Sequence, residues 1–200
     1  MKKFLSLLLL ILVGCSKPEP INMNEMLNER DDIYYTKDTN QPYSGPVFSL
    51  HENGQLSNEG ILKNGKLEGP FKVYYENGQL FRKVIYKNGE LDDGLYKTYY
   101  DNGQLSGEET YKNGKLEGPL KVYYGNGQLK EEYTIKNGER DGPHIKYYDN
   151  GQLSLEENYK NGILDGHQKS YRNGKLREEL TYKNGERYGP YRKYYDNGQL

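Results

Sequence analysis

The chain of 200 residues has few of the residue types that build enclosed sites and thick cores. It contains no tryptophan, four phenylalanines, three histidines and a single cysteine. One cysteine excludes a disulfide bond within the chain and a metal cluster held by cysteines. The 28 basic and 29 acidic side chains nearly balance, so the chain lacks the positive charge of nucleic-acid-binding proteins. We therefore expect no nucleic acid among its partners.

Long hydrophobic runs are also scarce, and the one that is present lies at the N-terminus. Lys2 and Lys3 precede an apolar stretch over residues 4–13. This pattern is typical of a secretory signal peptide, and the stretch is too short to cross a bilayer core of about 30 Å as a helix. Residues 12–15 read Leu-Val-Gly-Cys and resemble the lipobox of bacterial lipoproteins. The alternative is an ordinary cleaved signal that happens to carry a cysteine at its flank.

The lipobox resemblance implies a signal peptide over residues 1–14 and a lipidated N-terminus at Cys15. Acyl chains would then anchor the protein to a membrane, since two or more chains hold stably. In the lipoproteins that the sequence resembles, an aspartate directly after the cysteine favours retention in the inner membrane. Here that position is occupied by Ser16. The resemblance therefore implies a lipid-anchored location in the bacterial cell envelope, and the outer membrane where two membranes are present.

The segment after the cysteine is polar and contains Pro18 and Pro20. Removal of residues 1–14 takes away Lys2 and Lys3 and changes the net charge from −1 to −3. We expect the lipidated cysteine and a flexible tether over residues 15–32, with one possible helical turn around residues 25–29. A repeat domain then follows over residues 33–200.

Asn-Gly dipeptides dominate the rest of the chain. Intervals of 11 residues alternate with intervals of 12 to 14, so every second dipeptide falls 23 to 25 residues further on. A fixed period in this range predicts a stacked repeat. Asn-Gly is also the strongest short-range signal for a β-hairpin, because a type I′ turn needs positive φ at both central residues. Their asparagines are Asn53, Asn64, Asn77, Asn88, Asn102, Asn113, Asn126, Asn137, Asn150, Asn161, Asn173, Asn184 and Asn197.

Strand-like runs of five to eight residues lie between these dipeptides. For the first turn of a unit we expect a two-residue hairpin that pairs Glu76 with Gln79 and Tyr75 with Leu80. The second turn, as in residues 63–70, is predicted to be wider. Short connections favour an antiparallel meander. The predicted fold is therefore all-β: an elongated single-layer sheet of about 14 strands, made of stacked hairpins. Ile33 to Tyr35 would supply its first strand and cap.

Units open at a glycine, and two of them are irregular. The unit opening at Gly166 is one residue shorter and lacks a second tyrosine, which predicts a bulge or a register adjustment. The chain also stops at Leu200, directly after a turn, so we expect the last of about seven units to be incomplete. The opening glycines are Gly45, Gly69, Gly94, Gly118, Gly142, Gly166 and Gly189.

Several patterns that imitate functional sites are better explained by the repeat. Residues 60–67 match part of a phosphate-binding loop but lack the Ser or Thr after Lys66 and a following helix. His51, His144 and His167 share no local motif. Acidic residues that precede the unit glycines should lie about 9–10 Å apart, too far for a shared calcium ion. We expect those residues, Glu68, Asp93, Glu117, Asp141 and Asp165, to form a solvated edge. No metal, cofactor or catalytic residue is predicted.

The paired tyrosines that precede the first turns are the strongest candidates for a functional surface. Alternation along a strand places the two tyrosines of a pair on opposite faces. Tyrosine provides a large contact area at low entropic cost. The rows are therefore candidates for binding a protein, although they would also serve simply to cover and stiffen the sheet. One row is Tyr74, Tyr99, Tyr123, Tyr147 and Tyr194, and the other is Tyr75, Tyr100, Tyr124, Tyr148 and Tyr195.

The signatures YYxNGQL and YKNGKxxG over residues 43–200 resemble the bacterial variant of the MORN repeat. The resemblance implies a single-layer, twisted, elongated β-sheet. The ordinary repeat commonly carries a tryptophan, and this chain has none. Functions of eukaryotic MORN proteins are for that reason not carried over.

The sequence favours a non-enzymatic, envelope-anchored interaction or scaffold protein with a protein partner and possible self-association. Related variant repeats are named YwqK-type antitoxins, which implies an alternative role in neutralising a toxin in the envelope. A phosphoinositide kinase is disfavoured, because MORN repeats only accompany the kinase domain in some plant enzymes and no kinase motif occurs in this chain.

Overall fold

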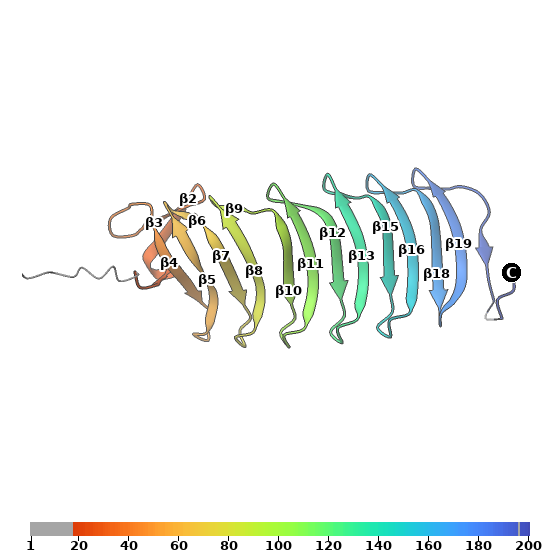
Figure 1. Cartoon of the computed structure of the whole chain (residues 1–200), viewed down its shortest axis with the longest axis horizontal. Coiled ribbons are helices and arrows are strands. Elements are labelled where there is room, and N and C mark those ends of the chain that lie inside the picture. The colour runs from red at the N-terminus through yellow and green to blue at the C-terminus, as the bar shows by residue number, and fades with distance from the viewer. Residues whose placement is uncertain (1–17, 196) are drawn as a thin grey trace, which may run out of the picture.

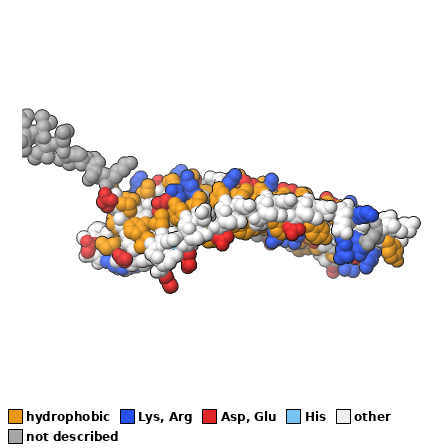
Figure 2. All heavy atoms as spheres, turned by 90° about the horizontal axis from the view of Figure 1, so that it is seen from below, with side chains coloured by type: hydrophobic (Ala, Val, Ile, Leu, Met, Phe, Trp, Pro, Cys, Tyr) orange, Lys and Arg blue, Asp and Glu red, His pale blue; other side chains and the backbone are white. Residues whose placement is uncertain are grey.

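The structure is a computed structural model that describes residues 18–195 and 197–200. The predicted signal peptide and Cys15 lie outside these residues. One elongated sheet, a single layer thick over most of its length, runs from the N-terminal to the C-terminal end of the described chain (Figure 1). Edge-on, the molecule is thin and gently bowed (Figure 2). The predicted all-β architecture is confirmed.

Twelve strands of six to nine residues form the body of the sheet. Each pairs antiparallel with its neighbours in chain order. They are β4 (Gly45–Leu50), β5 (Leu56–Lys63), β7 (Gly69–Tyr74), β8 (Leu80–Lys87), β10 (Gly94–Tyr99), β11 (Leu105–Lys112), β12 (Lys115–Tyr123), β13 (Leu129–Lys136), β15 (Gly142–Tyr147), β16 (Leu153–Lys160), β18 (Gly166–Arg172) and β19 (Lys175–Lys183).

Short two-residue strands complete the sheet. Five of them are the beginnings of the strands that follow: β6 (Lys66–Leu67), β9 (Glu90–Leu91), β14 (Glu139–Arg140), β17 (Ile163–Leu164) and β20 (Glu186–Arg187). The other two are β21 (Arg192–Lys193), which pairs with β19, and β1 (Ile21–Asn22) at the N-terminal end. The nineteen strands of this sheet therefore agree with the predicted number of about fourteen once the interrupted strands are joined.

The N-terminal segment differs from the predicted flexible tether. From Ile21 it is folded: β1 (Ile21–Asn22) pairs in parallel with β4, and α1 (Met23–Met26) follows. A small second sheet then forms from β2 (Leu27–Arg30) and β3 (Ile33–Thr36). Leu27 is buried against Val47 and Leu62, which explains why a largely polar segment folds here. The cap over the first repeat is thus larger than the single strand predicted from Ile33 to Tyr35, and β1 rather than β3 pairs with the first repeat strand.

The two kinds of turn are assigned the wrong way round by the sequence prediction. Second turns are the two-residue hairpins: Asn113 (φ 50°) and Gly114 (φ 71°) join the paired Lys112 and Lys115. Positive φ at both residues is what a type I′ turn requires.

First turns are three-residue loops in which only the glycine has positive φ. Gly78 (φ 80°) donates its N–H to the Tyr75 carbonyl, and the Tyr75 N–H donates to the Gln79 carbonyl, both at 2.9 Å. This arrangement matches a type I turn followed by a glycine bulge. The strand register changes accordingly, so Leu80 lies opposite Tyr74, and not opposite Tyr75 as predicted. The same correction applies to the equivalent pairs, which are Tyr99 with Leu105, Tyr123 with Leu129 and Tyr147 with Leu153.

The short unit at Gly166 differs from the others in its turn. Asn173 (φ 50°) and Gly174 (φ 73°) form a two-residue hairpin between the paired Arg172 and Lys175. A two-residue turn in place of a three-residue loop accounts for the missing residue. The register shift after Ser170 is not specific to this unit, because Val73 precedes the same shift in β7.

Candidate interaction surface

The two faces of the sheet have different chemistry. Val47, Val84, Leu120 and Leu180 are buried and point to one side, which we call the packed face. The alternate residues of the same strands point to the other side, which we call the charged face; Lys72 and Tyr74 lie on it. No helix of the described chain is long and apolar enough to cross a membrane.

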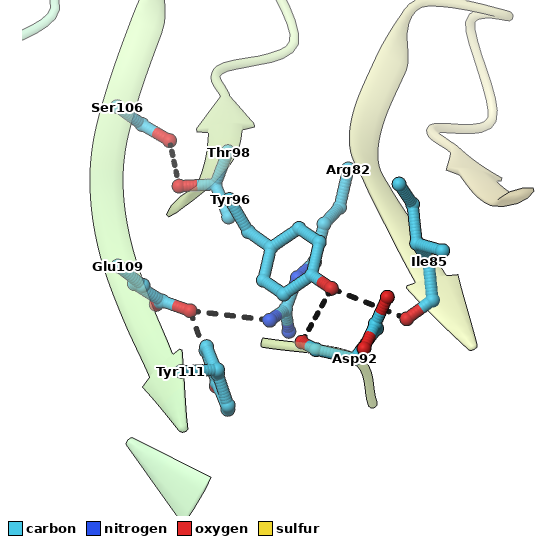
Figure 3. Close-up of polar contacts among 8 residues, drawn as sticks. All are labelled: Arg82, Ile85, Asp92, Tyr96, Thr98, Ser106, Glu109 and Tyr111. Carbon is cyan, nitrogen blue, oxygen red and sulfur yellow. Dashed lines mark hydrogen bonds and ion pairs between the residues drawn. The ribbon is translucent and has the colours of Figure 1, made fainter. Parts of the chain in front are cut away.

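The packed face also buries polar groups, and Figure 3 shows one such cluster. The Tyr96 hydroxyl donates to the backbone oxygens of Ile85 (3.2 Å) and Asp92 (2.7 Å). Arg82 pairs with the Glu109 carboxylate at 3.3 Å and lies over the Tyr111 ring. The groups come from β8, β10, β11 and the loop before β10, so the cluster joins these three strands into one unit.

A second polar cluster surrounds His144, whose side chain is only 1% exposed. Its Nε2 lies 2.8 Å from the Glu131 carboxylate, and its Nδ1 lies 3.3 Å from the Glu157 carboxylate. The rings of Tyr133 and Tyr159 pack against the imidazole. The hydrogen bond from His144 lowers the pKa of the Glu157 carboxyl below its ordinary value. The cluster is a compact polar group on the packed face, and the described chain contains no group of three or more His, Cys, Asp or Glu residues suited to a metal ion.

The second tyrosine of each pair links neighbouring repeats. The Tyr75, Tyr100, Tyr124 and Tyr148 hydroxyls donate to the backbone oxygens of Tyr99, Tyr123, Tyr147 and Tyr171, at 2.5 to 2.8 Å. His51 makes the equivalent contact with Tyr74 in the first repeat. Tyr195, in the last hairpin, is 69% exposed. Within the described repeats this row therefore holds successive hairpins together through its hydroxyls.

The first tyrosine of each pair lies on the charged face, and in most pairs its hydroxyl binds a glutamate. The hydroxyls of Tyr74, Tyr123 and Tyr147 donate to the carboxylates of Glu59 (2.7 Å), Glu108 (2.9 Å) and Glu132 (3.4 Å). Tyr171 makes the same contact with Glu156 at 2.6 Å. Burial and the neighbouring carboxylate raise the pKa of Tyr123 and of Tyr171 to about 12.

Two members of this row have no such glutamate contact. Tyr194 has a backbone hydrogen bond to Arg177. The hydroxyl of Tyr99 has no hydrogen-bond partner among the described residues, because Lys83 occupies the place that Glu59 has beside Tyr74. The sequence pattern of paired tyrosines gave no sign of this difference, since it depends on which residue of the neighbouring strand lies alongside.

The predicted solvated edge of acidic residues has a structural role as well. Each of these carboxylates accepts a hydrogen bond from the backbone N–H of the asparagine in the next two-residue turn. Glu117 and Asn137, for example, are 2.8 Å apart. The other pairs are Glu68 with Asn88, Asp93 with Asn113, Asp141 with Asn161, and Asp165 with Asn184. Their spacing serves successive turns instead of a shared cation.

Leucines complete the charged face beside the first tyrosines. Tyr and Leu alternate across the sheet at the same height, as in Tyr74, Leu80, Tyr99 and Leu105, and all four are half-buried. An open hollow of about 590 Å³ lies towards the N-terminal end and is lined by Pro46, Phe48, Leu50, Ile61 and Pro70 among others. The charged face thus offers a continuous amphipathic strip instead of an enclosed cavity.

Comparison with known protein families matches this repeat pattern. A family model described as "MORN repeat variant" matches residues 67–88, 92–113, 116–137, 140–161, 164–184 and 187–200, which is more than half of the chain. No curated protein matches the chain.

Proposed function

The chain belongs to the MORN repeat variant family, and from this we propose that it is a non-enzymatic interaction protein of the bacterial cell envelope. In this proposal the repeat sheet binds another protein through its charged face. The lipobox-like sequence before Cys15 supports the location, because a lipidated cysteine would hold the sheet at a membrane surface.

The observation that carries the proposal is the amphipathic strip on the charged face. Its half-buried Tyr and Leu side chains recur at one height across successive repeats, next to a row of charged residues. Aromatic residues are enriched at protein interfaces because they combine a large apolar area with a polar group. Although the hydroxyls of Tyr74, Tyr123 and Tyr147 bind glutamates, these side chains are only half-buried and keep area for a partner.

Site-specific photo-cross-linking in intact cells tests this proposal. The full-length, lipidated protein would carry a photo-reactive residue at Ile61, an exposed site on the charged face, or at Lys130, an exposed site on the packed face. We expect a discrete protein adduct from position 61 and none from position 130. No adduct from either site, or equal adducts from both, would contradict the proposal.

An immunity role is a special case of the same proposal. Identification of the cross-linked protein as a toxin that acts in the envelope would establish it, and any other envelope protein would support a scaffold role instead.

A further inference from the structure

Charges alternate along the central row of the charged face. Directly opposed residues on neighbouring strands are Glu59 and Lys72, Lys97 and Glu108, Glu108 and Lys121, Lys121 and Glu132, Glu156 and Lys169, Lys169 and Glu179, and Glu179 and Arg192. Opposite charges in such positions stabilise a sheet, and like charges destabilise it. Between Glu132 and Glu156 the row contains the uncharged Ile145, so these two glutamates do not oppose each other directly.

Like charges lie directly opposite one another at one place in this row of the described sheet. Lys83 on β8 lies directly opposite Lys72 on β7 and directly opposite Lys97 on β10. Lys72 pairs with Glu59 at 2.6 Å and Lys97 with Glu108 at 3.3 Å. Lys83 is exposed and has no acidic partner among the described residues. We call Lys72, Lys83 and Lys97 the lysine cluster; it carries one positive charge that the sheet leaves unbalanced.

The surroundings of the cluster are equally unusual. The Tyr99 hydroxyl beside it has no glutamate acceptor, so it remains able to donate a hydrogen bond to a partner or to accept one from it. On the other side lie Ile61, Ile85 and Leu95, which are 47%, 43% and 56% exposed. Lysine ammonium groups, a free hydroxyl and exposed aliphatic side chains thus converge over β7, β8 and β10.

We propose that the lysine cluster is a docking site for an acidic, partly apolar segment of a partner protein. The inference rests on the proposed function and names the chemistry of the partner. A carboxylate of the segment would pair with Lys83, and apolar side chains would cover Ile85 and Leu95. Charge complementarity of this kind directs binding and specificity.

A membrane surface fits the cluster less well. Binding to anionic lipid is typical of groups of about four to eight basic residues. Here three lysines are flanked by Glu59 and Glu108, which already neutralise two of them. The exposed aliphatic residues also lie in one row beside the lysines, as suits an extended segment.

Reversal of the charge at Lys83 distinguishes an effect on partner binding from an effect on the stability of the fold. Lys83→Glu restores the alternation of charge, so we expect it to raise the urea concentration at the unfolding midpoint. The same variant should weaken binding of a fluorescein-labelled peptide of alternating glutamate and leucine about tenfold. A matched control is Lys112→Glu, which makes the same charge change and removes the opposed pair of Lys112 and Lys115 at a turn of β11.

The expected result is that Lys112→Glu binds the peptide within about twofold of the unaltered chain. Equal losses in both variants, unchanged binding by Lys83→Glu, or no peptide binding by the unaltered chain would each overturn the inference. So would a lowered unfolding midpoint of Lys83→Glu. The unaltered chain could instead bind phosphatidylserine vesicles and not the peptide. If Lys83→Glu then abolished the vesicle binding, the ligand of the lysine cluster would be a lipid surface and not a protein segment.

The cross-linking experiment keeps this inference distinct from the proposed function. If position 61 still cross-links to the same protein in the Lys83→Glu variant, the interaction role stands and the lysine cluster is not its docking site. If position 61 forms no adduct in the chain with Lys83 intact, the proposed function itself fails.

Discussion

Residues that are adjacent in sequence and of the same type make different contacts in this sheet. Tyr74 and Tyr75 are adjacent, yet one binds the Glu59 carboxylate and the other binds the backbone of the next repeat. Both hydroxyls are needed because a sheet one layer thick has no second layer to cover it. Polar contacts between strands therefore supplement the small amount of apolar burial.

Tyrosine titration gives a test at this scale. The pKa of Tyr123 and of Tyr171 is raised from the ordinary 10.0 to about 12, mainly by burial and then by the glutamate. Because the unfolded chain loses these protons first, their stabilising contribution is complete below pH 10 and is lost as the pH rises through 12. We expect the free energy of unfolding, measured with urea, to fall over that range, and Tyr123→Phe to reduce the fall. The expectation would be contradicted if absorbance titration showed that the tyrosines ionise over the same pH range in the native and in the unfolded chain.

The network around His144 gives a test in the acid range. The pKa of Glu157 is lowered, so the stability that it contributes is present above the ordinary 4.5 and is lost as the pH falls through its folded-state value. His144→Leu removes the imidazole that lies against the Glu131 and Glu157 carboxylates, and should cost about 1–3 kcal/mol at neutral pH. Urea unfolding across the acid range should also show a weaker pH dependence in this variant. A variant with unchanged acid dependence would argue against the network.

At the scale of elements, one dipeptide serves two different turns. In second turns Asn137 has positive φ (53°), whereas in first turns Asn126 acts through its side chain. The Asn126 Oδ1 accepts from the Gln128 N–H at 3.0 Å, and its Nδ2 donates to the Asp149 carbonyl at 2.7 Å. The first turn is therefore joined to the next repeat by an asparagine side chain, and the second by a carboxylate.

The same substitution should have different costs at the two turns. Asn126→Gly removes two hydrogen bonds and should lower the free energy of unfolding by about 1–2 kcal/mol. Asn137→Gly keeps a residue suited to positive φ and should change it by no more than about 0.5 kcal/mol. Urea unfolding of the two single variants measures the difference. Equal losses would contradict the assignment of the turns.

The whole molecule is a linear array in which each hairpin contacts only its neighbours along the chain (Figure 1). Stability in such arrays is close to a sum of repeat and nearest-neighbour contributions. The N-terminal end is covered by Leu27 and the β2–β3 hairpin. Unfolding of one repeat is therefore expected to affect adjacent repeats more than distant ones.

Leu120→Ala tests this linear organisation. Leu120 is 7% exposed, and its truncation should cost about 2–5 kcal/mol. We expect hydrogen exchange to accelerate most in β10 to β13, while β4 and β5 keep their protection. Val84→Ala, in β8 and therefore nearer the N-terminus, should move the affected region in that direction. Uniform acceleration along the chain would indicate a single cooperative unit instead.

The sequence alone determined the repeat period, the all-β class and the positions of the turns, because Gly and Asn have strong local backbone preferences. It also identified the tyrosine rows, since alternation along a strand is a local property. Only the tertiary structure decided which turn is which, what the carboxylates bind, and that Lys83 lies between Lys72 and Lys97. These features depend on strand register, and register brings together residues 11 to 25 positions apart that no local pattern relates. The lysine cluster is visible for that reason only in the folded sheet.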